Sequence, residues 1–179
     1  MASTQKKYIG LLGGSFDPAH KGHLIISKIA IKKLKLRKIY WVITKKNPLK
    51  NKAFYSLDKR IKHAKKIIKA QKQIKIIHLD NVIKSSRTID LINYFIKKKK
   101  IKNLCFIIGS DNLIQFHKWK NWKKIVELVK LTVFSRKGYD RKGMKSTVVK
   151  NFKNKIIFIK NNHITISSTQ LKNQTSLNK

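Results

Sequence analysis

Two histidines three residues apart, His20 and His23, are the side chains whose types and spacing point most directly to chemistry. They close the segment GGSFDPAHKGH at residues 13–23, which follows an apolar run at residues 8–12 and precedes a helical pattern of apolar residues. A glycine turn between a strand and a helix presents backbone N–H groups at the positive end of the helix dipole. Because residues three apart on a helix share a face, both imidazoles can point at one bound phosphate chain. The segment therefore predicts a phosphate-handling active site.

The same segment leaves two other interpretations open. The histidine pair could hold zinc with Asp17 as a third ligand, or the histidines could be incidental to a loop that only caps a helix. The segment is not a Walker P-loop, because no Gly-Lys-Ser/Thr follows at the required spacing, and it lacks the dinucleotide pattern Gly-x-Gly-x-x-Gly. We expect no metal site built by the protein itself.

Two of the scarce acidic residues, Asp17 and Asp111, follow apolar strand-like runs, near glycines. With seven carboxylates in the chain, we expect these two to have a purpose. Gly109 would let a nucleoside approach the backbone, and the Asp111 carboxylate can accept hydrogen bonds from hydroxyl groups or cap a helix. Trp119 and Trp122 could be core residues, or Trp119 could offer a flat surface to a flat heteroaromatic ligand.

The elements that must position these residues alternate along the chain. Apolar runs predict strands at residues 8–12, 39–44, 74–79, 104–108, 131–135 and 156–159. Helical patterns lie between them, at residues 24–34, 57–69, 89–98, 122–129 and 142–152. Strands that alternate with helices predict an α/β fold with a Rossmann-like, doubly wound parallel sheet, in which ligands bind beyond the carboxyl ends of the strands. We expect one domain over residues 1–172 and a polar, frayed tail at residues 173–179.

The charge of the chain is extreme, with 44 basic residues against 7 acidic ones and a formal net charge of +37. Nucleic acid is an obvious partner for such a surface. However, 39 of the 44 are lysines, whereas nucleic-acid readers draw on arginine for bidentate and stacking contacts. We therefore expect no specific nucleic-acid partner. The lone Cys105 is expected to be a small buried hydrophobe, and without an apolar leader or span the chain is expected to be soluble and cytoplasmic.

At this point a resemblance is specific enough to name. Residues 13–23 are similar to the GGSFDPxHxGH signature of bacterial nicotinate-nucleotide adenylyltransferases, which belong to the HxGH nucleotidyltransferase superfamily. The resemblance implies adenylyl transfer from ATP to nicotinate mononucleotide in NAD biosynthesis, giving nicotinate adenine dinucleotide and pyrophosphate. Alternatives are the same transfer to nicotinamide mononucleotide or phosphopantetheine, and, outside enzymes, a basic RNA-binding module.

The resemblance also implies roles for individual residues. His20 and His23 are the catalytic pair, and Mg²⁺ arrives with ATP. The residues implied for ATP are Gly13, Gly14, His20, His23, Gly109, Asp111, Ser167, Ser168 and Lys172. Those implied for nicotinate mononucleotide are Ser15, Phe16, Lys50, Thr88, Trp119 and Arg136, the last as a ligand or as a cation that fixes a loop.

The sequence departs from the family pattern at three residues of two motifs. Lys172 replaces the arginine of the family's ISSTxIR motif, and lysine keeps the charge but loses the planar two-toothed grip. Arg87 and Leu91 replace the usual Tyr and Thr of a Ser-Tyr-Thr-x-x-Thr element, which leaves Thr88 as its matching residue.

Overall fold

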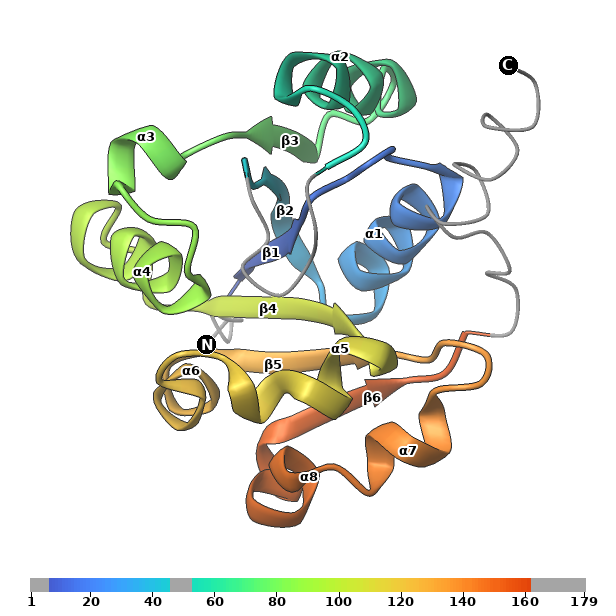
Figure 1. The fold of residues 1–179 in the computed structure, drawn as a ribbon, viewed down its shortest axis with the longest axis vertical. Coiled ribbons are helices and arrows are strands. Elements are labelled where there is room, and N and C mark those ends of the chain that lie inside the picture. The colour runs from blue at the N-terminus through green and yellow to red at the C-terminus, as the bar shows by residue number, and fades with distance from the viewer. Residues whose placement is uncertain (1–6, 46–52, 162–179) are drawn as a thin grey trace, which may run out of the picture.

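A six-stranded, entirely parallel sheet organises the protein (Figure 1). The computed structural model describes residues 7–45 and 53–161. The strand order is β3-β2-β1-β4-β5-β6, which is the order of doubly wound dinucleotide-binding folds. The strands are β1 (Tyr8–Gly14), β2 (Leu36–Ile43), β3 (Ile74–Ile77), β4 (Leu104–Gly109), β5 (Lys130–Phe134) and β6 (Ile156–Ile159). All six predicted strands are confirmed, and so is the α/β fold class.

The central strand β4 shows why the apolar runs identify the sheet. Its residues 104–108 are all buried, because helices cover both faces of a parallel sheet. The strand β1 differs from its prediction in length, since it continues through Gly13 and Gly14. The two glycines therefore end the strand, and the turn that was expected to include them begins at Ser15.

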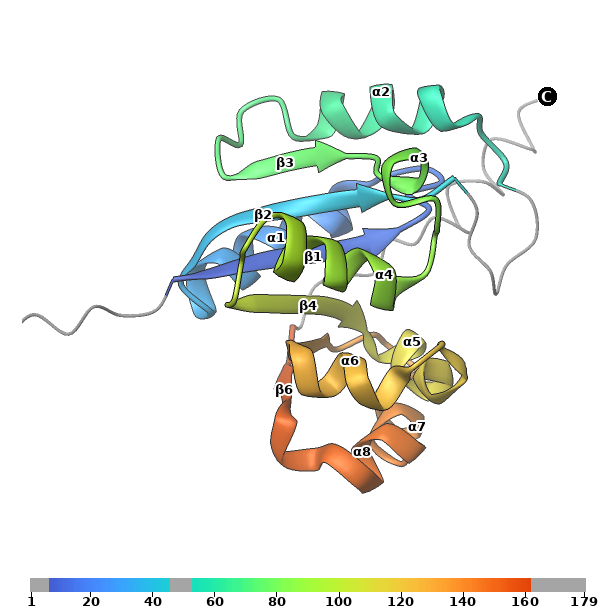
Figure 2. The same cartoon turned by 90° about the vertical axis from the view of Figure 1, so that its left-hand side faces the viewer.

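Helices cover the two faces of the sheet unequally (Figure 2). One face packs against α1 (Lys21–Lys33) and α2 (Leu57–Ile67) around Trp41, Ala64 and Ile107. The other packs against α4 (Thr88–Asn93), α6 (Trp122–Leu128) and α8 (Thr147–Phe152), together with α5 (Ser110–Gln115). In Figure 2, α4 and α6 lie in front of the sheet and α1 lies behind it.

Several helices differ from their predictions. The pattern at residues 142–152 is not one helix but two, α7 (Asp140–Met144) and α8, with Ser146 at the N-cap position of the second. The pattern at residues 89–98 forms α4 followed by a π-helical turn at Tyr94–Lys98. The short helices α3 (Asp80–Ile83) and α5 were not predicted, because four to six residues are too few to show a helical period.

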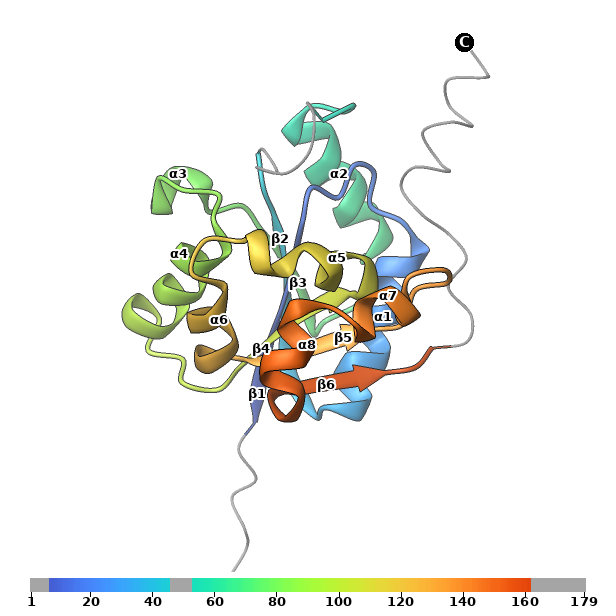
Figure 3. The ribbon, with the colours of Figure 1, turned by 60° about the horizontal axis from the view of Figure 1, so that its bottom comes forward.

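Three of these helices form the side of the fold next to β5 and β6 (Figure 3). Helix α5 packs against both α7 and α8, and a Cβ at Gly143 of α7 would lie 3.0 Å from the Ser110 carbonyl oxygen. This close approach places α7 directly beside the loops that follow β4 and β5. Within the residues that the structure describes, no helix is long and apolar enough to cross a bilayer.

Candidate active site

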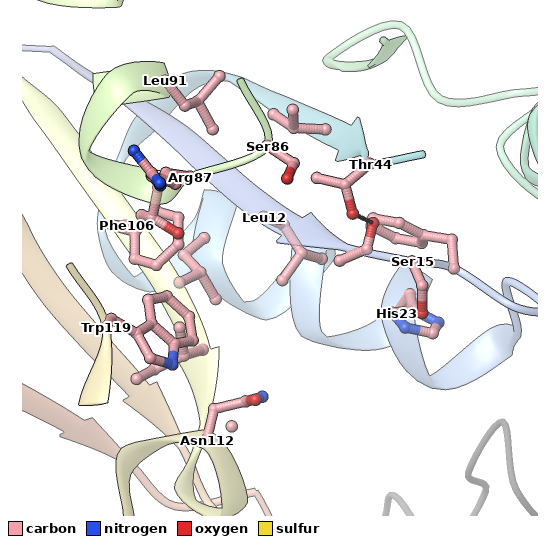
Figure 4. Close-up of a pocket in the computed structure, with 18 of the residues that line it drawn as sticks. Leu12, Ser15, His23, Thr44, Ser86, Arg87, Leu91, Phe106, Asn112 and Trp119 are labelled. Atoms are coloured by element: carbon pink, nitrogen blue, oxygen red, sulfur yellow. Dashed lines mark hydrogen bonds between the residues drawn. The ribbon is translucent and has the colours of Figure 1, made fainter. Parts of the chain in front are cut away.

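A cleft of about 490 Å³ opens at the carboxyl ends of the strands. It lies where β1 and β4 are neighbours and the chain leaves the sheet in opposite directions, which is where doubly wound sheets bind ligands. Its walls come from the segments that follow β1, β2, β3, β4 and β5. Figure 4 shows Ser15 and His23 at one end of the cleft and Arg87, Phe106 and Trp119 at the other.

The two histidines cap the first helix and each other. His20 is the N-cap residue of α1, and its Nδ1 accepts a hydrogen bond from the Gly22 backbone N–H at 3.1 Å. His23 is the third helical residue, and its Nδ1 accepts from the His20 backbone N–H at 3.2 Å. The arrangement is a capping box, with imidazoles in the roles that Ser or Thr and Glu usually fill. The histidines are therefore not incidental to the cap, because their own rings make it.

The capping box also fixes where the protons lie. A nitrogen that accepts a hydrogen bond carries no proton, so each neutral ring must hold its proton on Nε2. Burial lowers the pKa of His20 to about 4, with a further contribution from the Arg136 guanidinium. Burial, followed by the neighbouring His20, lowers the pKa of His23 to about 3. Both rings are thus neutral at pH 7, and each has an Nε2–H left to donate to a ligand.

His23 rests on an aromatic and hydrogen-bonded base. Its ring lies 4.8 Å from that of Phe16, which in turn stacks on Trp41 at 5.1 Å. The indole Nε1–H of Trp41 donates to Ser27 Oγ at 2.7 Å, and that hydroxyl donates to the His23 carbonyl oxygen at 2.8 Å. Phe16 has a left-handed backbone with φ of 47°. Its ring is 2% exposed, so burial offsets the cost of that conformation.

Asp17 anchors a loop through its carboxylate. Its carboxylate is 3% exposed and accepts hydrogen bonds from the backbone N–H groups of Phe54 at 2.8 Å and Tyr55 at 2.9 Å. Among residues 7–45 and 53–161, no three His, Cys, Asp or Glu side chains come together as a metal site. The zinc interpretation of the histidine pair therefore finds no third ligand there.

Arg60 is the most important residue that the sequence interpretation missed. It is 2% exposed, on the buried side of α2. Its Nη1 donates to the carbonyl oxygens of Ser15 at 2.6 Å and Thr44 at 2.8 Å. Its other nitrogens donate to the carbonyl oxygens of Lys45 and Tyr55. One guanidinium therefore joins the loop after β1 to both sides of the segment that contains Lys50.

A signal for Arg60 was present in the sequence. It stands three residues after Leu57 and four before Ala64, so it occupies the apolar stripe of a helical pattern. A cation in such a stripe is rarely buried without partners. Its charge is stabilised by Asp17 and then by Asp80, which oppose the effect of burial on its pKa.

Asp111 and Arg136 form an ion pair at the edge of the cleft. Arg136 Nη1 lies 2.5 Å from Asp111 Oδ2, whereas Asp111 Oδ1 is buried and has no hydrogen-bond partner within the described part of the chain. The carboxylate folds back over Gly109 and occupies the space that a Cβ at residue 109 would need, so a side chain there would collide with Oδ1. Arg136 was expected to be a ligand of nicotinate mononucleotide or a cation that fixes a loop. In the structure it lines the cleft, pairs with Asp111 and lies close enough to the histidines to lower their pKa values.

Asp140 holds the loops after β4 and β5 together, and the sequence interpretation assigned it no role. Its carboxylate accepts hydrogen bonds from the hydroxyls of Ser110 and Ser135 and from the Arg136 backbone N–H. Burial opposes ionisation of Asp140, but these hydrogen bonds outweigh it and keep its pKa below the usual value. The backbone of Arg136 is therefore fixed independently of its ion pair.

The two tryptophans have different environments. Trp122 packs edge-on against Phe152 at 5.6 Å and is a partly buried side chain against the hydrophobic core, in line with the expectation that it is a core residue. Trp119 packs against Phe116 at 4.8 Å and edge-on against Phe106 at 6.1 Å, but it also lines the cleft. Trp119 is thus a rigidly held aromatic surface that a ligand can reach.

Most of the predicted site residues come together in this one cleft. Its walls include Gly13, Gly14, Ser15, Phe16, His20, His23, Thr88, Gly109, Asp111, Trp119 and Arg136. Four others, Lys50, Ser167, Ser168 and Lys172, lie outside the described residues, as does the tail at residues 173–179. Their roles remain predictions. The cleft also contains Arg87, which was noted as a departure from a family motif and had no assigned role.

Comparisons with known proteins agree with this picture. The model of the cytidylyltransferase-like family matches residues 11–174. The probable nicotinate-nucleotide adenylyltransferase of Pelagibacter ubique (strain HTCC1062) is 50% identical over 171 residues, covering 95% of this chain and 94% of that protein. A probable nicotinate-nucleotide adenylyltransferase of Agrobacterium fabrum (strain C58 / ATCC 33970) is 31% identical over 183 residues, covering 92% of this chain and 97% of that protein.

Solved structures show the same fold. The nicotinic acid mononucleotide adenylyltransferase of Plasmodium falciparum, complexed with NaAD, superposes with a TM-score of 0.75 at 20% sequence identity. The superposition covers 94% of this chain and 83% of that one. At this identity the likeness concerns the fold, and the sequence relatives carry the family assignment.

Proposed function

This chain belongs to the cytidylyltransferase-like family and, within it, to the nicotinate-nucleotide adenylyltransferases, and from that membership we propose how its cleft carries the reaction. The enzyme transfers the adenylyl group of ATP to nicotinate mononucleotide, giving nicotinate adenine dinucleotide and pyrophosphate in NAD biosynthesis. A phosphate oxygen of the mononucleotide attacks the α-phosphorus in line, and the bond from that phosphorus to the bridging oxygen breaks. An ionised phosphate is already a nucleophile at neutral pH, so the step requires no general base.

The observation that carries this proposal is the pair of neutral imidazoles beside a fixed cation. Negative charge builds on the pyrophosphate oxygens as the bridging bond breaks, and preorganised donors aimed at that charge lower the barrier. The Nε2–H groups of His20 and His23 are such donors, because the capping box holds both rings and both tautomers in place. Arg136 supplies positive charge to the same region. The histidines therefore act as hydrogen-bond donors to phosphate and not as acids or bases.

The remaining residues of the cleft divide between the two substrates. We assign adenosine to Gly109 and Asp111, where the unpaired Asp111 Oδ1 is an available acceptor for a hydroxyl. We assign the mononucleotide to the wall formed by Ser15, Phe16, Thr88 and Trp119. The flat face of Trp119 suits stacking against a pyridine ring.

The described residues do not fit a metal ion held by the protein. They contain no cluster of three ligands, and the Asp111 carboxylate already pairs with Arg136. The Mg²⁺ that we propose is therefore carried on the ATP phosphates and water, which is usual for this cation, and it supplies charge neutralisation there.

A direct assay tests the proposed function. Pyrophosphate release is measured with ATP, Mg²⁺ and, in turn, nicotinate mononucleotide, nicotinamide mononucleotide and phosphopantetheine. The expected result is turnover that is fastest with nicotinate mononucleotide and is lost in a His20→Ala/His23→Ala double variant. Turnover with phosphopantetheine and neither pyridine mononucleotide would refute the proposal. Absence of turnover with all three acceptors would also refute it.

A further inference from the structure

Arg87 lines the cleft and has no counter-ion among the residues that the structure describes. Its side chain is exposed and lines the cleft, on the segment that leads into α4. Its backbone is held in place, because its N–H donates to Ser85 Oγ at 3.1 Å and its carbonyl oxygen accepts from Asp90 and Leu91. Within residues 7–45 and 53–161, the two ion pairs are His78 with Asp80 and Arg136 with Asp111, so neither involves Arg87.

The acidic side chains around the cleft are already engaged by other groups. Asp90, three residues further along α4, accepts a hydrogen bond from Ser85 Oγ at 2.7 Å. Asp80 accepts one from the Lys45 backbone N–H at 2.7 Å, and Asp111 pairs with Arg136. These carboxylates therefore leave Arg87 able to pair with an anion that comes with a ligand.

The surroundings of Arg87 indicate what kind of anion that is. In Figure 4, Arg87 lies with Leu91, Phe106 and Trp119 at the end of the cleft away from Ser15 and His23. Trp119 presents its ring there, held by Phe106 and Phe116. Lys118 and Lys120, on either side of Trp119 in the sequence, also line the cleft and add positive charge. An unpaired guanidinium beside a fixed aromatic face is complementary to a planar aromatic ring that bears a carboxylate.

From this arrangement we propose that Arg87 binds the ring carboxylate of the acceptor nucleotide and makes the enzyme prefer the acid over the corresponding amide. The inference rests on the proposed function, because it takes the Trp119 end of the cleft as the place of the pyridine ring. A guanidinium can donate two parallel hydrogen bonds to a carboxylate, and both are charge-assisted. A carboxamide offers one neutral acceptor, and its NH₂ group would face the donors of Arg87.

Arginine at this position also explains why the preference can be strong. A hydrogen bond between charged groups contributes more than a neutral one, and a partial loss of such pairing costs roughly 10- to 100-fold in affinity. Lysine would keep the charge and lose the two-pronged geometry. The preference for the acid over the amide should therefore be strongest with arginine at residue 87, weaker with lysine and weakest with glutamine.

Two measurements test this role. The first is kcat/KM for nicotinate mononucleotide and nicotinamide mononucleotide in the wild type, Arg87→Lys and Arg87→Gln. The second is the Kd of each mononucleotide by calorimetry, which needs no turnover. Arg37→Gln serves as the matched control, because Arg37 is exposed at the start of β2 and does not line the cleft.

The expected result is that Arg87→Gln lowers kcat/KM and affinity for the acid roughly 10- to 100-fold and changes those for the amide less than about twofold. Arg87→Lys should lie between, and Arg37→Gln should match the wild type. An unchanged acid-to-amide ratio in Arg87→Gln, or an equal loss for both acceptors, would overturn the inference. Absence of turnover in the wild type would instead refute the proposed function, while the ratio of the two Kd values would still report on Arg87.

Discussion

The backbone N–H of His20 donates to Nδ1 of His23, while Nδ1 of His20 accepts from the backbone N–H of Gly22 in the first turn of the same helix. The two residues of the signature therefore fix each other and together satisfy two backbone N–H groups at the helix start. The same hydrogen bonds place the ring protons on Nε2. Local folding of α1 and the chemistry of the site are thus two consequences of one arrangement.

This relationship predicts that substitutions of His23 separate stability from catalysis. Gln is a common residue at the third helical position of a capping box, because its side-chain oxygen accepts from the N-cap N–H. We expect His23→Gln to unfold close to the wild type and His23→Ala to lose about 1 kcal/mol. His23→Ala removes the Nε2–H donor and should lower kcat by roughly 10²- to 10³-fold, whereas His23→Gln keeps an amide N–H donor and should lower kcat less. Urea unfolding and kcat with nicotinate mononucleotide measure the two effects.

If His23→Ala kept near-wild-type kcat, the ring would act only as a cap. If His23→Ala were as stable as His23→Gln, the hydrogen bond from His20 would contribute nothing to the helix.

The lowered pKa values predict how stability depends on pH. The unfolded chain binds a proton on each histidine below about pH 6.5, whereas the folded protein does so at about pH 4 for His20 and about pH 3 for His23. Stability contributed by the neutral rings is therefore complete above pH 6.5 and is lost as the pH falls from 6.5 toward 3. The free energy of unfolding, measured by denaturant between pH 4 and 8, should decline with acidification below 6.5.

His23→Gln provides the matched comparison for this pH dependence, since it keeps the cap and removes one titrating ring. Its decline below pH 6.5 should be shallower than that of the wild type. Parallel pH profiles for the two proteins would contradict the neutral state of His23.

The fold could be predicted from the sequence because its causes are local. Each parallel strand is covered on both faces, so it appears as a short continuous apolar run, as in residues 104–108. The cleft could be predicted for a related reason, since parallel strands bring their carboxyl ends to one edge of the sheet. Gly13, Gly109 and Arg136, far apart in the chain, meet there because each follows or ends a strand.

The supports of the site could not be predicted because they join distant segments. Asp17 holds residues 54 and 55, and Arg60 holds Ser15, across intervals of 37 to 45 residues. Asp140 fixes Ser110 across 30 residues. Nothing in the local pattern shows which backbone groups a buried polar side chain will meet. The short helices α3 and α5 were not predicted because they are too short to show a helical period. Helices α7 and α8 were predicted as one helix because the sequence between them shows no break in the helical pattern.

Arg60 is expected to be a positioning residue whose loss affects both stability and the acceptor site. In Arg60→Met, four carbonyl oxygens lose a buried donor. Each buried polar group left without a partner lowers the free energy of unfolding by about 1–3 kcal/mol. We expect the variant to lose about 3 kcal/mol of stability, and its KM for nicotinate mononucleotide to rise more than its KM for ATP. Denaturant unfolding and steady-state kinetics measure both.

Lys62→Met, exposed on the same helix, is the control and should match the wild type within about 0.5 kcal/mol. Arg60→Lys should recover part of the stability without recovering the KM, because one ammonium cannot reach carbonyls on three sides. An equal rise in both KM values would leave Arg60 as a support of the core alone.

Gly109 is expected to matter because of Asp111 and not because of its own flexibility. A Cβ at residue 109 would collide with Asp111 Oδ1, so Gly109→Ala should push the carboxylate away from Arg136. Overpacking of this kind costs about 1–3 kcal/mol, and loss of the ordered carboxylate should raise the KM for ATP. In Asp111→Ala the obstructing oxygen is gone, so adding Gly109→Ala to that variant should change stability and KM little. The four proteins form a double-mutant cycle, and strong non-additivity is the expected outcome. Additive losses would mean that residue 109 touches the nucleotide or the sheet directly, since a shared collision makes the second substitution nearly silent.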